Sequence, residues 1–406
     1  MRIAMIGPFA LYPKGTVSVR ILPIAKALKS RGYDVAVFLP PYDNLKYSGK
    51  HLKVDSVDIY NATMLKTRLS FIHFLTTVQL VTKALTFRPH IIHVFKPKGY
   101  SGLAVMLLIL LKKMKLVAKP LVVDSDDWEG YGGFATFYLR YTVYPRIVSS
   151  FFDFQEKWII GKVDCLTVAS KLLEKQAMAL HVPPEKIFYV PNGPHHDQNT
   201  LDGSHGNKRF KMENGPTILL YTRFFEFKIE KIIDILSKVR EKLKNAQLLV
   251  IGRGMFREEE DLLRLAKERT IEKALIYVGW IHSKDIPYYL TLGDVAIYPY
   301  DDTLLNRSKC PGKLVELMTA GKAIIAENVG QISEYIIDGE SGLLVTSGDN
   351  EMFAQKIVKA LEDRQLRAKL GDNAKRRIKS YFCWDRLIVK VEEAYHTALG
   401  IQPSKE

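Results

Sequence analysis

The chain has 406 residues, of which 47% are apolar and 25% are charged, values close to the average of soluble globular proteins. This length is too great for one ordinary core and predicts two or three domains. The net charge of +15 favours anionic partners, among which charge alone does not distinguish nucleic acid, anionic lipid and phosphorylated small molecules. The three cysteines, Cys165, Cys310 and Cys383, form no Cys-x-x-Cys pair, which argues against a disulfide framework or a zinc site.

The first residues, MRIAMIGPF, lack the parts of a secretory signal peptide. The longest apolar run covers residues 103–111, whereas crossing a bilayer requires roughly 20 residues. We interpret this run as a buried helix; because Lys112, Lys113 and Lys115 follow it, a helix lying on a membrane surface is the alternative. We therefore expect a cytoplasmic protein, with peripheral attachment to the inner face of the cell membrane left open.

The first half of the chain alternates between predicted strands and helices. An apolar run at 2–6, an amphipathic helix at 19–31 and a second apolar run at 34–39 form a βαβ unit, which is typical of parallel sheets. A helix is predicted over 101–114, and Ser170 is expected to cap another that begins at Lys171. The further strands predicted here are at 91–94, 121–123, 165–168 and 188–190.

A break in composition separates this half from a second one. Residues 195–216 are rich in His, Asn, Asp, Gly and Lys and poor in apolar residues, which is typical of a linker. The strands predicted after it are at 217–221, 247–251, 274–278, 295–298 and 323–326. The predicted organisation is therefore an α/β domain at 1–193, a linker at 194–215, a second α/β domain at 216–380 and a C-terminal helical segment at 381–406.

Two cations follow the first strand of the second half. Arg223 and Lys228 lie between this strand and the next helix, where basic side chains and a helix N-terminus favour a diphosphate. A solvated loop is the alternative. The glycines of the segment 251–254 allow a close approach to a ligand, but Arg257 stands where a dehydrogenase fingerprint needs its third glycine.

A second cluster in this half begins a predicted helix. Pro311 and Gly312 open the helix, and Lys313 and Glu316 follow one turn apart. The amides of a helix N-terminus bind phosphate, and Glu316 is suited to accept hydrogen bonds from a ribose diol. The alternative is a surface glutamate that only benefits from the helix dipole. The loop at Gly279 is a candidate for backbone contacts with a nucleobase.

These motifs, in this order, resemble family four of the retaining glycosyltransferases. The segments that carry the resemblance are Gly15, Pro191 to Gly193, Arg223 with Lys228, Gly279, Asp294 to Pro299, Glu316 with Ala320-Gly321, and Tyr381 to Trp384. They cover nearly the whole chain. The resemblance implies the GT-B fold, with two Rossmann-like parallel-sheet domains facing a central cleft and a C-terminal helix packing back on the first domain. It also implies transfer of a hexose-type sugar from a nucleotide-diphosphate sugar to a lipid-linked or saccharide acceptor, with retention.

The resemblance also assigns donor-binding residues. It implies that Arg223 and Lys228 hold the diphosphate, that Glu316 binds the ribose and that Gly15 lets the first loop approach the donor. The remaining donor-side residues that it implies are Gly279, Cys310, Pro311, Gly312 and Lys313. The family often has a glutamate eight residues before the ribose glutamate, where this chain has Ser308, so the identity of the transferred sugar stays open.

An acidic loop in the first half supplies the acceptor-side candidates. Asp124, Asp126, Asp127 and Glu129 lie close together, and like charges repel unless a function or a partner holds them. We predict that Asp126 and Asp127 are the catalytic residues; an exposed acidic loop is the alternative. The further acceptor-side candidates, at and near strand ends, are His93, Asp124 and Asn192; for His93 a structural role is the alternative. We expect no metal and no cofactor, because the nominal Asp-x-Asp of this loop lies in the half that does not bind the donor.

Three other functions remain open at this point. One is a nucleotide-sugar epimerase of the same fold, and another is a nucleotide-sugar-binding protein without activity. A nucleic-acid reader is the third, but no RNA-binding motif or basic recognition helix supports it. The aromatic residues interspersed with Lys and His over 69–90 favour an anionic membrane surface as the partner of the basic chain.

Overall fold

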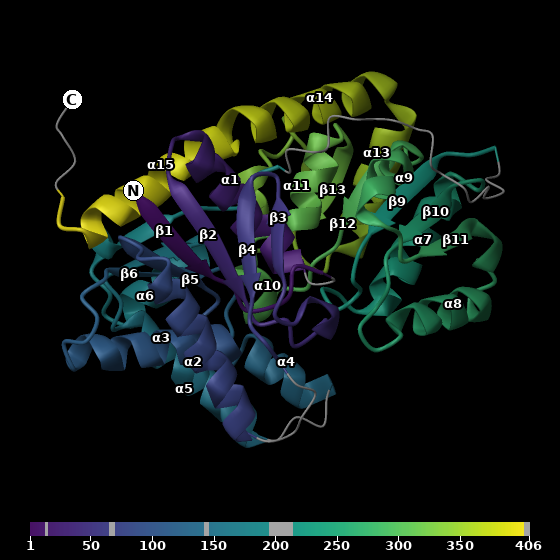
Figure 1. Cartoon of the computed structure of the whole chain (residues 1–406). Helices are drawn as coiled ribbons and strands as arrows, with labels where there is room; N and C mark the ends of the chain where they lie inside the picture. The colour runs from purple at the N-terminus through teal and green to yellow at the C-terminus, as the bar shows by residue number, and fades with distance from the viewer. Residues whose placement is uncertain (13–14, 65–69, 142–145, 195–213, 402–406) are drawn as a thin grey trace. The chain divides into compact units, whose positions relative to one another are not determined.

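The structure, a computed structural model, describes residues 1–12, 15–64, 70–141, 146–194 and 214–401. It consists of two compact units (Figure 1). Unit 1 contains Met1–Asn192, Ser308–Cys310 and Trp384–Glu406, and unit 2 contains Gly193–Arg307 and Pro311–Cys383. Most of the predicted linker, residues 195–213, lies outside the described residues.

Unit 1 is built on an eight-stranded sheet with the order β3-β4-β2-β1-β5-β6-β7-β8. Its strands are β1 (Arg2–Ile6), β2 (Asp34–Leu39), β3 (His51–Val54), β4 (Val57–Asn61), β5 (Ile91–Phe95), β6 (Leu121–Ser125), β7 (Cys165–Val168) and β8 (Ile187–Tyr189). All neighbouring pairs are parallel except β3 and β4. The Asp55–Ser56 turn joins those two, and both of its residues have positive φ, as a tight hairpin turn requires.

Helices cover both faces of this sheet. They are α1 (Leu22–Ser30), α2 (Ser70–Thr86), α3 (Gly99–Lys113), α4 (Phe134–Tyr141), α5 (Arg146–Ile160), α6 (Lys171–Ala179) and α15 (Trp384–Ala398), with short turns η1 (Val17–Ile21), η2 (Leu45–Tyr47) and η3 (Pro184–Lys186). Because side chains alternate along a strand, Ile3 and Met5 pack with α1 and α15, whereas Ala4 and Ile6 pack with α2, α3 and α5.

Unit 2 repeats this architecture with six parallel strands in the order β11-β10-β9-β12-β13-β14. They are β9 (Thr217–Tyr221), β10 (Gln247–Ile251), β11 (Leu275–Gly279), β12 (Val295–Tyr298), β13 (Ala323–Glu327) and β14 (Leu343–Val345). The helices are α7 (Ile229–Lys242), α8 (Glu258–Glu268), α9 (Ile286–Thr291), α10 (Leu304–Ser308), α11 (Gly312–Thr319), α12 (Ile332–Tyr335), α13 (Asn350–Glu362) and α14 (Arg364–Tyr381), with turns η6 (Glu272–Ala274) and η7 (Ser283–Asp285).

The structure confirms two α/β units with mainly parallel sheets and the cap at Ser170, whose Oγ accepts from Leu173 N at 3.3 Å. The strand bounds agree with the prediction or differ by one or two residues. The predicted helix at 19–31 differs, because it begins as the π-helical turn η1 before α1. Pro23 near the start of α1 has no N–H to donate, and this interrupts the regular hydrogen-bond pattern.

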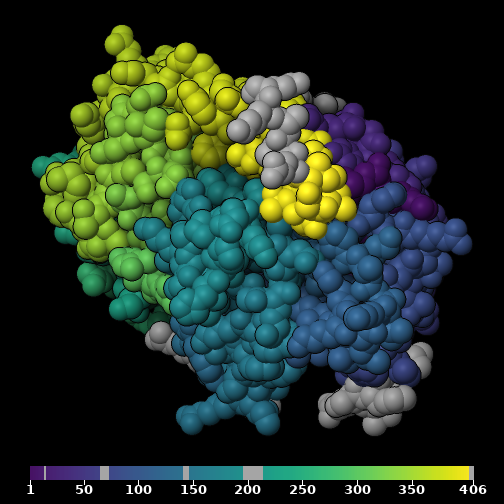
Figure 2. All heavy atoms as spheres, turned by 90° about the vertical axis from the view of Figure 1, so that its left-hand side faces the viewer, coloured from purple at the N-terminus to yellow at the C-terminus, as the bar shows by residue number. Residues whose placement is uncertain are grey.

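The last helix, α15, completes the core of unit 1. Trp384, Ile388 and Tyr395 are each 1% exposed or less and belong to the same apolar cluster as β1 and α1. Figure 2 shows this C-terminal segment in yellow beside the purple N-terminal residues of the same unit. The two ends of the chain therefore contribute to one core.

We expect Ile388→Ala to destabilise unit 1 by about 2–5 kcal/mol, because it removes a fully buried side chain and leaves a cavity. The matched control is Val389→Ala on the same helix. Val389 is 39% exposed, and its replacement should change the free energy of unfolding by about 0.5 kcal/mol or less. Urea unfolding followed by circular dichroism measures both; equal effects of the two variants would contradict this packing.

Candidate functional site

The parallel order of unit 2 gathers its candidate residues at one edge. The carboxyl ends of parallel strands meet at the same edge of a sheet, which is where ligands bind in open α/β folds. The loops after β9, β10, β11 and β12 all leave from this edge. Arg223 with Lys228, Gly252 and Tyr300 lie in the loops after β9, β10 and β12, and Gly279 is the last residue of β11.

The loop between β9 and α7 is anchored by its aromatic residues. Phe224, with a positive φ of 70°, and Phe227 are buried in the core, and Phe224 N donates to Thr222 Oγ1 at 2.8 Å. Arg223 and Lys228 are exposed, and Lys228 immediately precedes α7. Two cations are therefore held at the sheet edge by the burial of their neighbours.

Glycines keep the backbone at this edge open. Gly252 has φ of 126°, and an added Cβ would come within 1.9 Å of Thr222 O, so no other residue fits there. Gly279 has φ of 81°, which also favours glycine. Gly15 in unit 1 differs: it is exposed, and a Cβ would meet only Val19 Cγ2 at 3.6 Å, so the fold itself does not require glycine there.

A buried ion pair fixes the loop after β12. Lys231 Nζ donates to both oxygens of Glu327 at 2.8 Å and lies 2.6 Å from Asp301 Oδ1. Glu327 also accepts from Tyr300 N at 2.6 Å and Gly348 N at 2.7 Å, and Asp301 Oδ2 accepts from Lys228 N at 3.0 Å. The hydrogen bond from Lys228 N to Asp301 thus joins the loops that follow β9 and β12, and the Lys231–Glu327 ion pair holds the second loop through Asp301 and Tyr300 N.

The start of α11 brings three of the predicted residues together. Pro311 precedes the helix without a side-chain cap, so the first-turn amides of Gly312 and its neighbours lie at a helix start suited to an anion. Lys313 Nζ lies 4.9 Å from the centroid of the Tyr221 ring, and the Tyr221 hydroxyl hydrogen-bonds Glu316. Removal from water raises the pKa of Glu316 to about 7, although Lys313 and the Tyr221 hydrogen bond oppose the rise.

A small cavity lies beside these residues. Its lining comes from the ends of β9 and β12, the loops that follow them and α11: Leu220, Tyr221, Thr222, Glu226, Phe227, Ile297, Tyr298, Pro299, Tyr300 and Lys313. Arg223, Lys228 and Glu316 are not part of this lining but lie on the same loops or the same helix. Unit 2 therefore combines cations, helix amides and one carboxylate of raised pKa at one sheet edge.

The acidic loop of unit 1 is paired with two lysines. Lys96 Nζ lies 3.1 Å from Asp126 Oδ1, 2.6 Å from Asp127 Oδ2 and 3.1 Å from Glu129 Oε1. Lys98 Nζ lies 2.6 Å from Glu129 Oε2. The side chains of Asp126 and Asp127 retain 12% and 18% exposure, whereas that of Glu129 retains 1%. The two predicted catalytic aspartates are thus the members of this cluster that reach solvent.

Asp124, predicted on the acceptor side, is fully buried and paired with Arg20. Arg20 Nε and Nη2 donate to its two oxygens, each at 2.6 Å, and Thr167 Oγ1 donates to Oδ2 at 2.6 Å. Burial opposes the charge on Arg20, but Asp124 outweighs it and raises the arginine's pKa. Asp124 has no exposed surface, so its contacts here are structural, and its acceptor-side role stays a prediction.

His93, also predicted on the acceptor side, is likewise enclosed. Its side chain is 0% exposed, its Nδ1 is hydrogen-bonded to the Tyr395 hydroxyl at 2.9 Å, and its Nε2 lies 3.3 Å from Thr167 Oγ1. Burial, together with the charge of Arg20, lowers the pKa of His93 to about 3. A neutral, enclosed imidazole connects the sheet to α15 and is not available to an acceptor.

Asn192 and Cys310 bind each other within unit 1. Asn192 N donates to Cys310 Sγ at 3.1 Å, and its Nδ2 donates to the Cys310 carbonyl at 3.0 Å, while Arg20 Nη1 donates to Asn192 Oδ1 at 3.1 Å. Asn192 is 6% exposed and Cys310 is 9% exposed. Their observed contacts hold the segment around Cys310 to the end of the β8 loop, and their predicted binding roles stay predictions. Ser308 is fully buried, and its carbonyl accepts from Ser170 Oγ at 2.7 Å.

The sequence analysis missed four charged residues that organise these sites: Arg20, Lys96, Lys231 and Glu327. A signal exists for two of them. Arg20 stands alone within the apolar run 17–25, and Lys96 directly follows a buried strand, so each is a charge in a segment that the pattern places in the interior. Lys231 and Glu327 carry no such signal, because charged residues near helix starts and strand ends are common.

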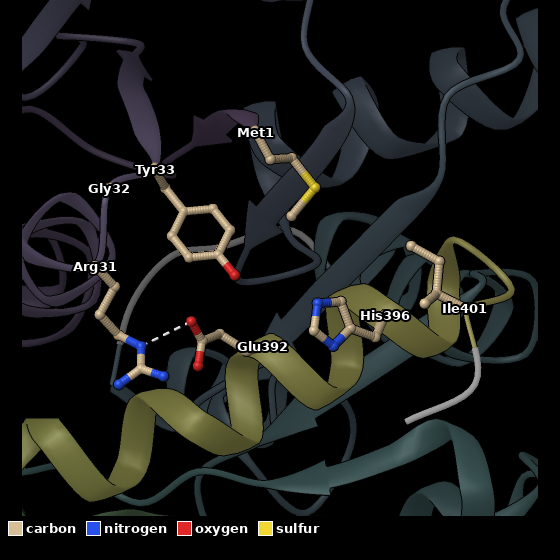
Figure 3. A pocket seen from close by; sticks show the side chains of 7 residues that line it. All are labelled: Met1, Arg31, Gly32, Tyr33, Glu392, His396 and Ile401. Atoms are coloured by element: carbon tan, nitrogen blue, oxygen red, sulfur yellow. Dashed lines mark hydrogen bonds and ion pairs between the residues drawn. The ribbon is translucent and has the colours of Figure 1, made fainter. Parts of the chain in front are cut away.

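A second hollow lies at the opposite edge of the unit 1 sheet (Figure 3). It is lined by residues from the chain start, the α1–β2 turn and α15: Met1, Arg31, Gly32, Tyr33, Glu392, His396 and Ile401. Arg31 Nε donates to Glu392 Oε1 at 2.7 Å across it. The pair ties the end of α1 to α15.

The described residues offer neither a metal-binding cluster nor a membrane-spanning helix. No group of three or more His, Cys, Asp or Glu side chains in this part of the chain is placed to hold a metal ion. Among the helices that the structure describes, none is long and apolar enough to cross a bilayer.

Two family profiles match the chain, one in each half. The profile described as "Glycosyl transferase 4-like domain" matches residues 15–193, and the profile described as "Glycosyl transferases group 1" matches residues 205–377. The first match lies almost entirely within unit 1 and the second within unit 2. Together they span most of the chain.

Named relatives and solved structures agree with the profiles. The phosphatidyl-myo-inositol mannosyltransferase of Mycolicibacterium smegmatis is 24% identical over 413 aligned positions, which cover 98% of this chain and 95% of that protein. A GDP-mannose-dependent alpha-(1-6)-phosphatidylinositol monomannoside mannosyltransferase of Mycobacterium tuberculosis is 22% identical over 242 positions, covering 57% and 61%.

Among solved structures, Anabaena HepE in complex with UDP superposes with a TM-score of 0.68 at 16% identity, covering 98% of this chain and 100% of that one. At this identity the likeness concerns the fold. From these matches, the chain belongs to the group 1 glycosyltransferases and is a glycosyltransferase of the GT-B fold.

Proposed function

We propose that this enzyme transfers a hexose-type sugar from a nucleotide-diphosphate sugar to a lipid-linked or saccharide acceptor, with retention of anomeric configuration. The observation that carries the proposal is the sheet edge of unit 2, where two exposed cations come from the loop after β9 and Glu316 comes from the first turns of α11. These groups match the diphosphate and the ribose of a sugar nucleotide. The relatives are named as transferases, which favours transfer over the epimerase and over the inactive binding protein.

The two cations, Arg223 and Lys228, are assigned to the donor's diphosphate. Breaking the bond from the anomeric carbon to the diphosphate oxygen leaves negative charge on the leaving group and an oxocarbenium-like sugar. Arg223, Lys228 and the amides at the start of α11 would stabilise that charge, which is the role otherwise given to a metal ion. We therefore propose that no metal and no cofactor is needed.

Glu316 is assigned to the ribose. A carboxylate accepts two hydrogen bonds from a vicinal diol, and the Tyr221 hydroxyl and Lys313 hold this carboxyl in place. The nucleobase is not specified by these contacts: one relative is named for GDP-mannose, and HepE was solved with UDP.

The acceptor is assigned to the acidic loop of unit 1. Asp126 and Asp127 keep solvent exposure at the carboxyl end of β6, and a hydroxyl nucleophile is a suitable hydrogen-bond donor to a carboxylate. For retention by attack on the same face, the leaving diphosphate accepts the acceptor proton, and the aspartates then orient the hydroxyl. The acceptor named for the mycobacterial relative, phosphatidyl-myo-inositol, supports a lipid-linked or saccharide class.

We also propose that an anionic membrane surface is a partner, which would place the enzyme on the inner face of the cell membrane. The helices α2, α3 and α5 and the segment after α3 expose large apolar side chains: Phe74, Leu75, Leu110, Met114, Leu116, Ile147, Phe151 and Phe154. Lysines and an arginine lie among them: Lys112, Lys113, Lys115, Arg146 and Lys157. Apolar side chains interspersed with basic ones are typical of surfaces that bind anionic lipid.

Transfer is tested with labelled donors. UDP-, GDP- and ADP-glucose and GDP-mannose are incubated with vesicles containing phosphatidylinositol and with short glucans, and the products are separated. We expect one donor to give an acceptor-dependent product whose anomeric configuration, read by NMR, matches the donor. Interconversion of donor sugars without an acceptor would instead support an epimerase.

We expect Arg223→Ala and Lys228→Ala each to weaken binding of the preferred nucleoside diphosphate roughly tenfold or more, because each removes a charge-assisted contact. Thermal shift titrations measure this, since a ligand that binds only the native state raises the melting temperature. The matched control is Arg264→Ala on α8, an exposed arginine paired with Asp261 and Glu268. Unchanged affinity in both test variants would exclude this donor site.

Glu316 should make donor binding depend on pH. Its pKa is raised to about 7, and only the ionised form accepts both ribose hydroxyls, so affinity for the intact nucleotide sugar should rise from pH 6 to pH 8. The sugar nucleotide is used because its diphosphate diester does not titrate in this range. Glu316→Gln should weaken binding roughly tenfold at pH 8 and remove most of the pH dependence. A wild-type slope retained in Glu316→Gln would contradict the assignment.

The membrane proposal is tested by flotation with vesicles of phosphatidylglycerol and phosphatidylcholine at low salt. We expect binding by the wild type and a roughly tenfold or larger loss in Ile147→Asp/Phe154→Asp, because both side chains would leave the apolar interface and add negative charge. Leu263→Asp on α8 is the control, since Leu263 is an exposed apolar residue of unit 2. Absence of wild-type flotation would exclude this partner.

A further inference from the structure

Lys96 lies at the point where two neighbouring strands of unit 1 end. β5 and β6 are parallel, with Phe95 opposite Asp124, and Lys96 N donates to the Asp124 carbonyl at 2.8 Å. This register places Lys96 directly beside the acidic loop that follows β6. Its side chain is 7% exposed, so its ammonium group lies beneath the loop and not on the surface.

The Lys96 ammonium contacts three carboxylates at once. It is 2.6 Å from Asp127, 3.1 Å from Asp126 and 3.1 Å from Glu129. The first two belong to side chains with remaining exposure, and the third is enclosed. One ammonium group therefore holds two solvent-reaching carboxylates in a fixed relation to each other.

The backbone of Lys96 is strained in a way that favours this placement. Its φ is 63°, a left-handed conformation that costs a residue with a Cβ free energy and persists only where the surroundings determine it. Ser101 Oγ donates to the Lys96 carbonyl and holds the turn. A glycine or an asparagine would adopt this conformation more easily. The backbone conformation therefore does not explain why residue 96 is a lysine, whereas the contacts of its side chain do.

The other charged groups near the two aspartates are largely occupied. Arg20 makes its bidentate pair with Asp124, and Lys98 is paired with Glu129 at 2.6 Å. Glu156 accepts from Gly130 N at 2.6 Å, and burial raises its pKa well above the ordinary value. Within the part of the chain that the structure describes, Lys96 is therefore the cation in direct contact with the aspartate pair.

Burial and Lys96 act in opposite directions on the pKa values of the two aspartates. Burial raises the pKa of Asp126 and of Asp127, the negative charges of Asp124, Glu129 and the pair itself add to the rise, and Lys96 opposes it, aided at Asp126 by Arg20. Removing the lysine charge would raise both pKa values further. Lys96 therefore opposes protonation of both aspartates.

We propose that Lys96 is a positioning residue for the transfer reaction: its ammonium group holds the carboxylates of Asp126 and Asp127 side by side and ionised at the end of β6, where they accept the hydrogen bond of the acceptor hydroxyl. This inference rests on the proposed function, in which these aspartates contact the acceptor. Lys96 itself lies below them and does not touch the acceptor.

The test is a pH–rate profile of Lys96→Met with the donor and acceptor that give transfer, or with water as the acceptor of the same donor. We expect kcat at pH 7 to fall at least roughly tenfold and the acid limb of the profile to move up by about one pH unit or more, because an adjacent opposite charge has been removed. Donor affinity should stay within about twofold, since the donor contacts lie in unit 2. Lys96→Arg should restore the position of the limb.

Lys98→Met is the matched control, because it removes a buried lysine of the same cluster that contacts Glu129 and neither aspartate. It should leave the acid limb in place. An equal shift in Lys98→Met, or a Lys96→Met enzyme with wild-type kcat and limb, would overturn the proposal. The double variant Asp126→Asn/Asp127→Asn separates the acceptor role of the aspartates from the positioning role of Lys96. Full activity in the double variant would exclude the acceptor role. Loss of activity in the double variant together with a Lys96→Met enzyme that behaves as wild type would exclude only the role of Lys96.

Discussion

The parallel order of the strands is the constraint on which both sites depend. In a parallel sheet the carboxyl ends of all strands lie at the same edge, so side chains from loops far apart in the chain lie close together there. In unit 2 this brings together the cations after β9, the glycines after β10 and β11 and the ordered loop after β12. In unit 1 it brings Lys96 after β5 beside the aspartates after β6. Either arrangement would be lost if its strands ran antiparallel.

Buried ion pairs then turn these loops into defined sites. Lys231 with Glu327 ties α7 to the end of β13 in unit 2, and Arg20 with Asp124 ties η1 to β6 in unit 1. A buried pair contributes little net stability compared with apolar residues of the same shape, but breaking it leaves an uncompensated charge. Such pairs are therefore better understood as devices that exclude alternative loop arrangements than as sources of stability.

Much of the fold was predictable because apolar patterning and glycine positions report directly on burial. The strands at 2–6, 34–39, 165–168, 217–221, 247–251 and 295–298 were found at the predicted residues. The β3–β4 hairpin was not predicted, because Asp55 and Ser56 both adopt positive φ in its turn and neither is the glycine that usually indicates such a turn. The donor side could be outlined from Arg223, Lys228 and Glu316, which follow recognisable strand ends or helix starts.

The acceptor side shows where such reasoning fails. Asp124, Asp126, Asp127 and Glu129 are equivalent in the sequence, yet Asp124 and Glu129 are enclosed and the other two reach solvent. What separates them is the position of Arg20, Lys96 and Lys98, which come from segments 30 or more residues earlier in the chain. The role of an acidic residue at a strand end therefore depends on whether its cation occupies both carboxylate oxygens or leaves the carboxylate partly exposed to solvent. For Asp124 the arginine takes both oxygens, and for Asp126 and Asp127 the lysine holds the carboxylates from below and leaves them accessible to a hydroxyl group.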